Sequence, residues 1–73
     1  MQPAFFVICV NRQGYEASLE IRKVYRAVPD EAASKRSMTR VIDESGEDYL
    51  YPSSFFVPIE VPEEAQEAFA AAS

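Results

Sequence analysis

The residues that could perform covalent or acid–base chemistry are few in this chain. Cys9 is the only cysteine among the 73 residues, and there is no histidine. A thiol nucleophile therefore lacks its usual base, and the usual zinc ligand sets of four thiolates or imidazoles cannot be assembled. Cys9 also lies inside an apolar run, where burial disfavours the reactive thiolate. The sequence predicts a buried core cysteine, no catalytic residue, no metal site and no cofactor, and hence no enzyme.

A cluster of carboxylates lies around one glycine. Carboxylates this close together suit a hard cation, but their spacing does not match the calcium-binding loop with its distal glutamate. A glycine between two β-prone runs is typical of a turn, so we favour the solvated tip of a hairpin. The cluster consists of Asp43, Glu44, Glu47 and Asp48.

Aromatic residues are the strongest candidates for a binding surface. Tyrosine suits surfaces that are partly apolar and partly hydrated, and the chain has more rings than a very small core must bury. The alternative is simple packing of these rings, with their hydroxyl groups at the rim of the core. The candidate binding residues are Tyr25, Tyr49, Tyr51, Pro52 and Phe55.

Charge is distributed unevenly along the chain, whose net charge is −5. Residues 1–42 contain seven basic and four acidic residues, whereas residues 43–73 contain eight acidic residues and no basic one. Basic side chains on one side of a small barrel would suit RNA phosphates, but the carboxylates downstream would repel the same backbone. Nucleic acid is therefore the less favoured partner. The basic group comprises Arg22, Lys23, Arg26 and Arg40.

These side chains must be positioned by short elements, and the first half of the chain predicts strands. Residues 5–10 are β-branched and aromatic and apolar on both faces, so one face meets the core and the other needs a cover. A turn at 11–14 leads to a second strand within 17–28, which bends near Arg22 because its apolar positions change face there. Residues 29–36 predict a structured loop with at most a turn or two of helix.

A hairpin is predicted where residues 38–43 and 48–51 flank a glycine-containing turn. Two registers are compatible with this sequence. A two-residue loop would pair Val41 with Leu50, and a bulged three-residue loop would pair Ile42 with Leu50. Either register buries an apolar pair.

Two further elements complete the chain. Residues 55–59 form a last extended apolar segment, with Pro58 at an edge or a strand end. Pro62 opens an amphipathic helix over residues 62–72, and its apolar stripe includes Phe69. We expect this helix to cover the outer face of the first strand, with Phe69 as the anchor.

The segment Leu50-Tyr51-Pro52-Ser53-Ser54-Phe55-Phe56-Val57 resembles the end of an SH3-like barrel, where a one-turn helix of the type Pro-Ser-Asn-Tyr precedes the last strand. Pro52 matches the proline of that motif, and Phe55 matches its tyrosine. The block of residues 40–52 is similar to that of short bacterial proteins of this architecture. The resemblance implies a mostly β fold, an SH3-like small barrel of about five strands with a short C-terminal helix, and no activity.

The length of the chain predicts one domain spanning residues 1–73. A lone cysteine fits a reducing, cytoplasmic compartment, and the apolar run at 4–10 is far shorter than the ~20 residues of a membrane span. We predict a non-enzymatic protein-interaction or structural module with a protein partner or self-association and no membrane contact. RNA binding by a small barrel is the alternative.

Overall fold

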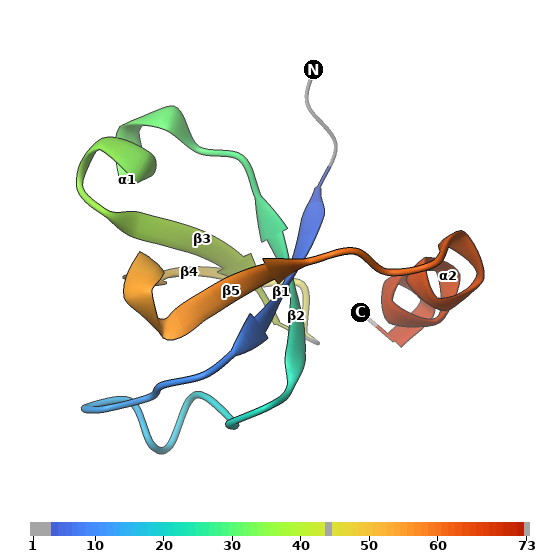
Figure 1. Ribbon diagram of the computed structural model, residues 1–73, viewed down its shortest axis with the longest axis horizontal. Helices are drawn as coiled ribbons and strands as arrows, with labels where there is room; N and C mark the ends of the chain where they lie inside the picture. Colours follow the sequence, from blue (N-terminus) through green and yellow to red (C-terminus); the bar gives the residue numbers. More distant parts are fainter. Residues whose placement is uncertain (1–3, 44, 73) are drawn as a thin grey trace.

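The computed structural model describes residues 4–43 and 45–72, without the side chains of residues 69–72. Five strands, a one-turn 3-10 helix and two α-helices follow one another along the chain (Figure 1). The elements are β1 (Phe5–Cys9), β2 (Val24–Val28), α1 (Glu31–Lys35), β3 (Met38–Ile42), β4 (Asp48–Pro52), η1 (Ser53–Phe55), β5 (Phe56–Ile59) and α2 (Glu63–Ala72). The mostly β fold with a short C-terminal helix is confirmed.

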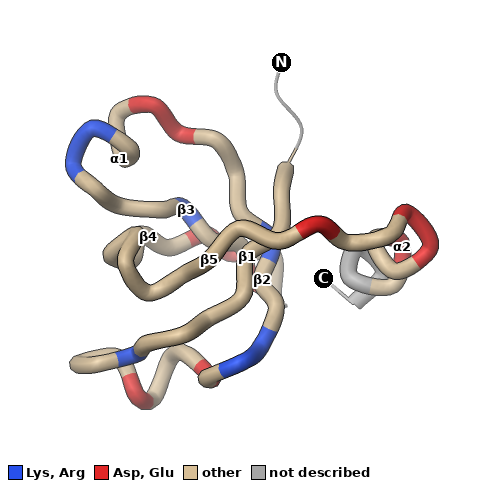
Figure 2. The backbone as a smooth tube through the Cα atoms, in the orientation of Figure 1, with Lys and Arg blue, Asp and Glu red and all other residues tan. Residues whose placement is uncertain are grey.

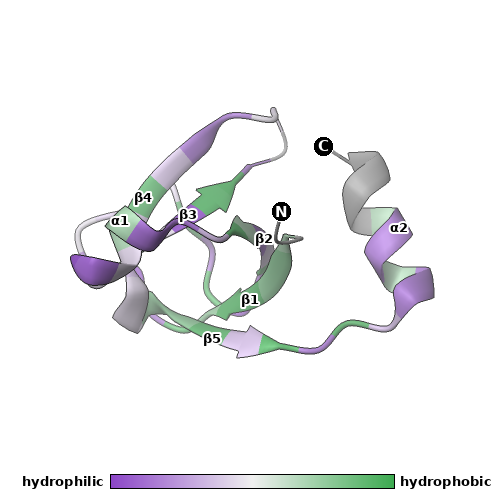
Figure 3. Cartoon of the chain, turned by 90° about the horizontal axis from the view of Figure 1, so that it is seen from above, coloured by the Kyte–Doolittle hydropathy of each residue, from purple (hydrophilic) through white to green (hydrophobic). Residues whose placement is uncertain are grey.

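The strands form one antiparallel sheet in the order β4-β3-β2-β1-β5. The sheet curls around its apolar face (Figure 3). The helical turn η1 lies between β4 and β5, at the place that the resemblance to an SH3-like barrel implies. β4 and β5 are the two edges of the described sheet. Closure of the sheet into a barrel stays a prediction.

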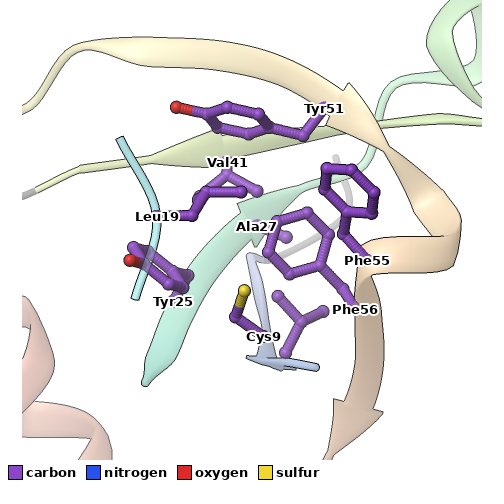
Figure 4. Close-up of a cluster of buried hydrophobic side chains, with 9 residues drawn as sticks. Cys9, Leu19, Tyr25, Ala27, Val41, Tyr51, Phe55 and Phe56 are labelled. Carbon is purple, nitrogen blue, oxygen red and sulfur yellow. The ribbon is translucent and has the colours of Figure 1, made fainter. Parts of the chain in front are cut away.

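The core lies on the concave face of this sheet. β1 contributes Val7 and Cys9, which alternate with Phe6 and Ile8 on the opposite face, as residues of a strand must. Figure 4 shows how aromatic rings from β4, η1 and β5 close over these small side chains. The buried cluster consists of Val7, Cys9, Leu19, Tyr25, Ala27, Val41, Tyr51, Phe55 and Phe56.

The second strand is shorter than the sequence predicts. Instead of running from 17 to 28, it begins at Val24, and residues 17–23 follow a path of turns. The predicted bend is confirmed at Arg22, which adopts a φ of 69° and donates its N–H to the Cys9 carbonyl at 2.7 Å. Because these turns bring Leu19 inward, the loop places a buried side chain in the core without forming a strand.

The hairpin is confirmed, but both of its predicted registers are wrong. Val41 pairs with Tyr49, and the ladder ends where Asp43 donates its N–H to the Glu47 carbonyl at 2.9 Å. Two features favour this register: Gly46 takes a φ of 87°, and the Asp43 carboxylate accepts backbone N–H groups inside the turn. The consequence is that Val41, Tyr49 and Tyr51 share one face of the sheet.

A proline interrupts each edge of the sheet. Hydrogen bonds in an antiparallel ladder alternate, so the residues between bonded pairs turn their N–H and C=O groups outward. The hydrogen bond from Asp43 to Glu47 closes the hairpin and sets this alternation, so the backbone nitrogen of Pro52 faces away from β3. On the other edge, Val10 donates to the Phe55 carbonyl at 2.7 Å, which puts Pro58 outward on β5. Both edges therefore lack a donor at these positions, which disfavours pairing with another strand.

Cys9 is fully buried, as predicted, and its thiol lies 3.2 Å from the carbonyl oxygen of Asn11, to which it donates. A reagent reaches it only when the fold opens. We expect a thiol reagent to modify Cys9 at least about a thousandfold more slowly in the native protein than in denaturant. The rates can be compared by absorbance. A native rate close to the denatured one would mean an accessible thiolate and would reopen a redox or catalytic role.

The predicted C-terminal helix is present as α2, which follows β5 through an extended linker and stands to one side of the sheet (Figures 1 and 3). Its side chains from Glu63 to Ala68 are exposed, apart from half-buried Ala65. The expected anchor, Phe69, lies outside the described side chains, so its role stays a prediction. Neither α1 nor α2 has the length and apolar character that crossing a bilayer requires.

Truncation tests whether α2 covers the sheet. Phe6 points to the outer face of β1 and is nevertheless buried. The prediction that α2 covers this apolar face implies that a chain ending at Ile59 loses stability and binds a hydrophobic dye. Dye fluorescence and the urea midpoint report the change. A truncated chain that is dye-negative and as stable as the full chain would show that α2 covers nothing.

Candidate functional site

A pocket of about 330 Å³ lies between the loop of residues 10–23, here called the β1–β2 loop, and the β3–β4 hairpin. The loop forms one wall and the hairpin the other. Tyrosines contribute three of its lining side chains, so we call it the tyrosine groove. It is lined by Ala17, Ser18, Leu19, Tyr25, Val41, Asp43, Tyr49 and Tyr51.

The wall formed by the β1–β2 loop is tied to the core by two tyrosine hydroxyl groups. The Tyr25 hydroxyl accepts the N–H of Glu20 at 2.9 Å, and the Tyr51 hydroxyl is hydrogen-bonded to Ser18. The two hydroxyl groups lie on the same side of the cluster, next to the segment that carries Leu19 (Figure 4). Because these rings are themselves buried, the loop is held against a rigid base.

Aromatic rings continue from the groove toward η1. Tyr15 stands edge-on to Tyr51, with ring centroids 5.3 Å apart, and to Phe55, with centroids 5.7 Å apart. Tyr49 lies 6.3 Å from Tyr51 on the other side. These are favourable distances for aromatic pairs. Tyr15 and Tyr49 are partly exposed, so the row of rings has two accessible ends and a buried middle.

The five candidate residues from the sequence separate into different environments. Tyr25, Tyr51 and Phe55 are buried in the core, whereas Tyr49 is 42% exposed at the rim of the groove. Pro52 is half-buried at the end of β4 and does not line the groove. The structure thus brings Tyr25, Tyr49 and Tyr51 together around the groove, and of these three only Tyr49 is exposed.

Sequence reasoning missed Tyr15. Its position depends on the turn at 11–14, where Gly14 takes a φ of 85° and Tyr15 donates its N–H to the Arg12 carbonyl at 2.7 Å. The turn itself was predicted, and a tyrosine directly after its glycine was the available signal. Where that ring would point depended on the path of the whole loop, which residue patterns do not specify.

Both hairpin tyrosines of the groove are held as neutral phenols. The Tyr49 hydroxyl donates to the Glu47 carboxylate, and this hydrogen bond with the adjacent negative charge raises the pKa of Tyr49 to about 12. Burial raises the pKa of Tyr51 as well. A phenol that stays protonated keeps its O–H donor, so the groove does not supply a tyrosinate base near neutral pH.

Carboxylates at the rim of the groove stay ionised. Hydrogen bonds from its own N–H and from that of Gly14 lower the pKa of Glu16. The Ser45 hydroxyl, followed by backbone N–H groups of the turn, lowers the pKa of Asp43. Part of the predicted carboxylate cluster therefore stabilises the hairpin turn, as expected for a hairpin tip. Glu44 lies outside the described residues.

Two of the four basic residues proposed for RNA, Arg40 and Lys23, are paired with carboxylates. Figure 2 shows basic and acidic positions at several separate places along the chain. Arg40 bridges two carboxylates: its Nε lies 2.7 Å from Asp30, the N-cap of α1, and its Nη1 lies 2.8 Å from Asp48. Lys23 lies 3.3 Å from Glu20 and also faces the ring of Tyr25, 5.2 Å from its centroid. A hollow of about 630 Å³ between α1 and β3 contains the Arg40–Asp30 pair, whose charges already balance each other.

The carboxylate hydrogen bonds predict how stability changes with pH. The pKa values of Asp30, Asp43 and Glu16 are lowered in the fold. These carboxylates therefore stabilise the folded protein above their unfolded pKa values near 4, and this stabilisation is lost as the pH falls through their folded pKa values. The raised pKa of Tyr49 has the opposite effect. The Tyr49 phenol stabilises the folded protein below about pH 10, and this stabilisation is lost as the pH rises through about 12.

We therefore expect the urea midpoint to fall below about pH 5 and again above about pH 10. A pH series of unfolding curves measures both changes. Tyr49→Phe should weaken the alkaline decline and leave the acid one, because it removes only the phenol. A midpoint that stays constant from pH 5 down to pH 3 would contradict the role assigned to the three carboxylates.

Comparison of the chain with protein-family models, with curated proteins and with solved structures gave no match.

Proposed function

We propose that this protein is a non-enzymatic interaction module whose tyrosine groove holds a segment of a partner protein. The observation that carries the proposal is the exposed ring of Tyr49, which stands on a buried aromatic base at the mouth of a preformed pocket. Tyrosine provides a large contact area with few rotatable bonds, so little conformational entropy is lost when a partner fixes its side chain.

The environment of the groove supports recognition rather than catalysis. The two hairpin tyrosines of the groove, Tyr49 and Tyr51, have raised pKa values, its wall is fixed by hydrogen bonds, and the lone thiol is buried in β1. A lone, buried thiol also suits a reducing compartment, which is why we place the protein in the cytoplasm. The groove has the mixture of apolar base and polar rim that is common at the centre of protein interfaces.

Two other partners were open from the sequence. Self-association through a sheet edge is disfavoured by Pro52 and Pro58, which leave gaps in the donors of both edges. RNA binding stays the alternative, but the pairing of Arg40 with two aspartates reduces the charge available for phosphates. A segment of a different protein, seated in the groove, is the occupant that we favour.

Affinity capture from the native cell, followed by mass spectrometry, tests the proposal when two neighbouring variants are compared. Tyr49→Ala removes the exposed ring of the groove. Leu50→Ala is the matched control, because Leu50 is similarly exposed, at 37%, and points to the opposite face of the same strand.

We expect a partner that is retained by the unchanged protein and by Leu50→Ala, and that is depleted at least about tenfold by Tyr49→Ala. Nuclease treatment before capture distinguishes a protein partner from a nucleic acid. A partner lost with Leu50→Ala and kept with Tyr49→Ala would overturn the proposal, as would recovery of RNA alone.

A further inference from the structure

The tyrosine groove continues into a second hollow that is negatively charged. This hollow, of about 310 Å³, shares five lining residues with the groove, including Tyr25 and Asp43. Three carboxylates line it, from Glu16, Glu20 and Asp43, against one ammonium group, that of Lys23. Lys23 lies 3.3 Å from Glu20, so the excess negative charge belongs to Glu16 and Asp43. Two joined hollows thus offer exposed aromatic surface at one end and carboxylates at the other.

Hydrogen bonds within the fold orient both of these carboxylates. Asp43 accepts the turn N–H groups through Oδ1, and Glu16 accepts the Gly14 N–H through Oε2. Arg12 lies close enough to Glu16 for Coulombic attraction, but its Nη1 donates to the Leu19 carbonyl at 3.2 Å. The turn therefore fixes the orientation of the Asp43 carboxylate, which lines both hollows.

We propose that the partner segment carries arginine, which inserts beside Tyr49 and pairs with Asp43; this inference rests on the proposed function of the groove. A guanidinium group is planar, so it can stack on a tyrosine ring while it donates to a carboxylate. The groove supplies both surfaces around Asp43, which lines both hollows. Glu16 adds a second negative charge along the path of the segment. The hydrogen-bonded phenol of Tyr49 keeps its ring neutral and available for stacking.

The matched probes are two short synthetic peptides, one in which arginine alternates with alanine and one in which citrulline replaces each arginine. Citrulline keeps the shape of arginine and removes its charge. Each peptide is titrated into isotope-labelled full-length protein while the amide signals of Ser18, Asp43 and Tyr49 are followed by NMR. The double variant Glu16→Gln/Asp43→Asn keeps the acceptor oxygens of the turn and removes both charges.

The control variant Glu31→Gln/Glu64→Gln removes two exposed charges from α1 and α2, away from the groove. We expect the arginine peptide to move the groove signals, and its affinity to fall about tenfold with citrulline or with Glu16→Gln/Asp43→Asn. The control variant should bind within about twofold of the unchanged protein. Binding should also weaken as salt rises.

Three results would overturn the inference: citrulline binding equally well, the groove variant binding as tightly as the control variant, or no groove signal moving at millimolar peptide. The proposed function has a separate readout in the capture experiment. If capture still depends on Tyr49 while the arginine peptide fails, the groove binds a partner of other chemistry. If capture is independent of Tyr49, the function itself is wrong.

Discussion

Replacement of Tyr51 by alanine should destabilise the protein by about 3 to 5 kcal/mol. The ring is buried and lies against Tyr15, Tyr49 and Phe56, so its loss opens a cavity between the hairpin, η1 and the β1–β2 loop. A domain of this size has a total stability of about 4 to 11 kcal/mol. The urea midpoint, followed by circular dichroism, should therefore show a protein close to unfolding.

Tyr51→Phe is the matched control, because it keeps the ring and removes only the hydroxyl that bonds Ser18. We expect it to cost about 1 kcal/mol, the usual worth of one hydrogen bond. The difference between the two variants measures the packing of the ring. A Tyr51→Ala variant that is within about 1 kcal/mol of the unchanged protein would show that the ring is not part of the core.

Replacement of Leu19 by alanine should cost about 2 to 5 kcal/mol. Leu19 is only 2% exposed, although it belongs to a loop rather than to a strand. Its side chain holds the β1–β2 loop against the sheet and forms part of the groove. The substitution should therefore lower the urea midpoint and, where the protein still folds, broaden the amide signals of the loop.

Ile21→Ala in the same loop provides the comparison. Ile21 is 40% exposed, so its truncation should change stability by no more than about 0.5 kcal/mol. Equal effects of the two substitutions would mean that the loop packs differently from the structure described above. An effect confined to Leu19 would show that this single side chain anchors the loop.

Much of the fold follows from local residue patterns. The β-branched and aromatic residues at 5–10, the glycine-containing turn at 44–47 and the proline before residues 63–72 each predicted an element that the structure contains. These patterns work because side-chain periodicity and turn chemistry act over a few residues. The register of the hairpin was not predicted, since it depends on hydrogen bonds of the Asp43 carboxylate within the turn, and a shift of one residue leaves the composition unchanged.

The site was predictable only in part, for a physical reason. Tyr25, Tyr49 and Tyr51 were recognisable as aromatic candidates, but the sequence did not separate the exposed ring from the buried ones. That separation depends on the β1–β2 loop, whose path is set by the positive φ of Arg22 and by contacts with residues distant in sequence. Tyr15 was missed for the same reason. Loops are fixed by tertiary contacts rather than by periodicity.

The central claim is that partners bind at the tyrosine groove, and photo-crosslinking in the native cell tests it most directly. A photoreactive phenylalanine analogue is placed at Tyr49 in one protein and at Leu50 in another, on opposite faces of β4. We predict a covalent adduct with a partner protein from position 49 and none from position 50. An adduct from position 50 alone, or no adduct from either position, would contradict the claim.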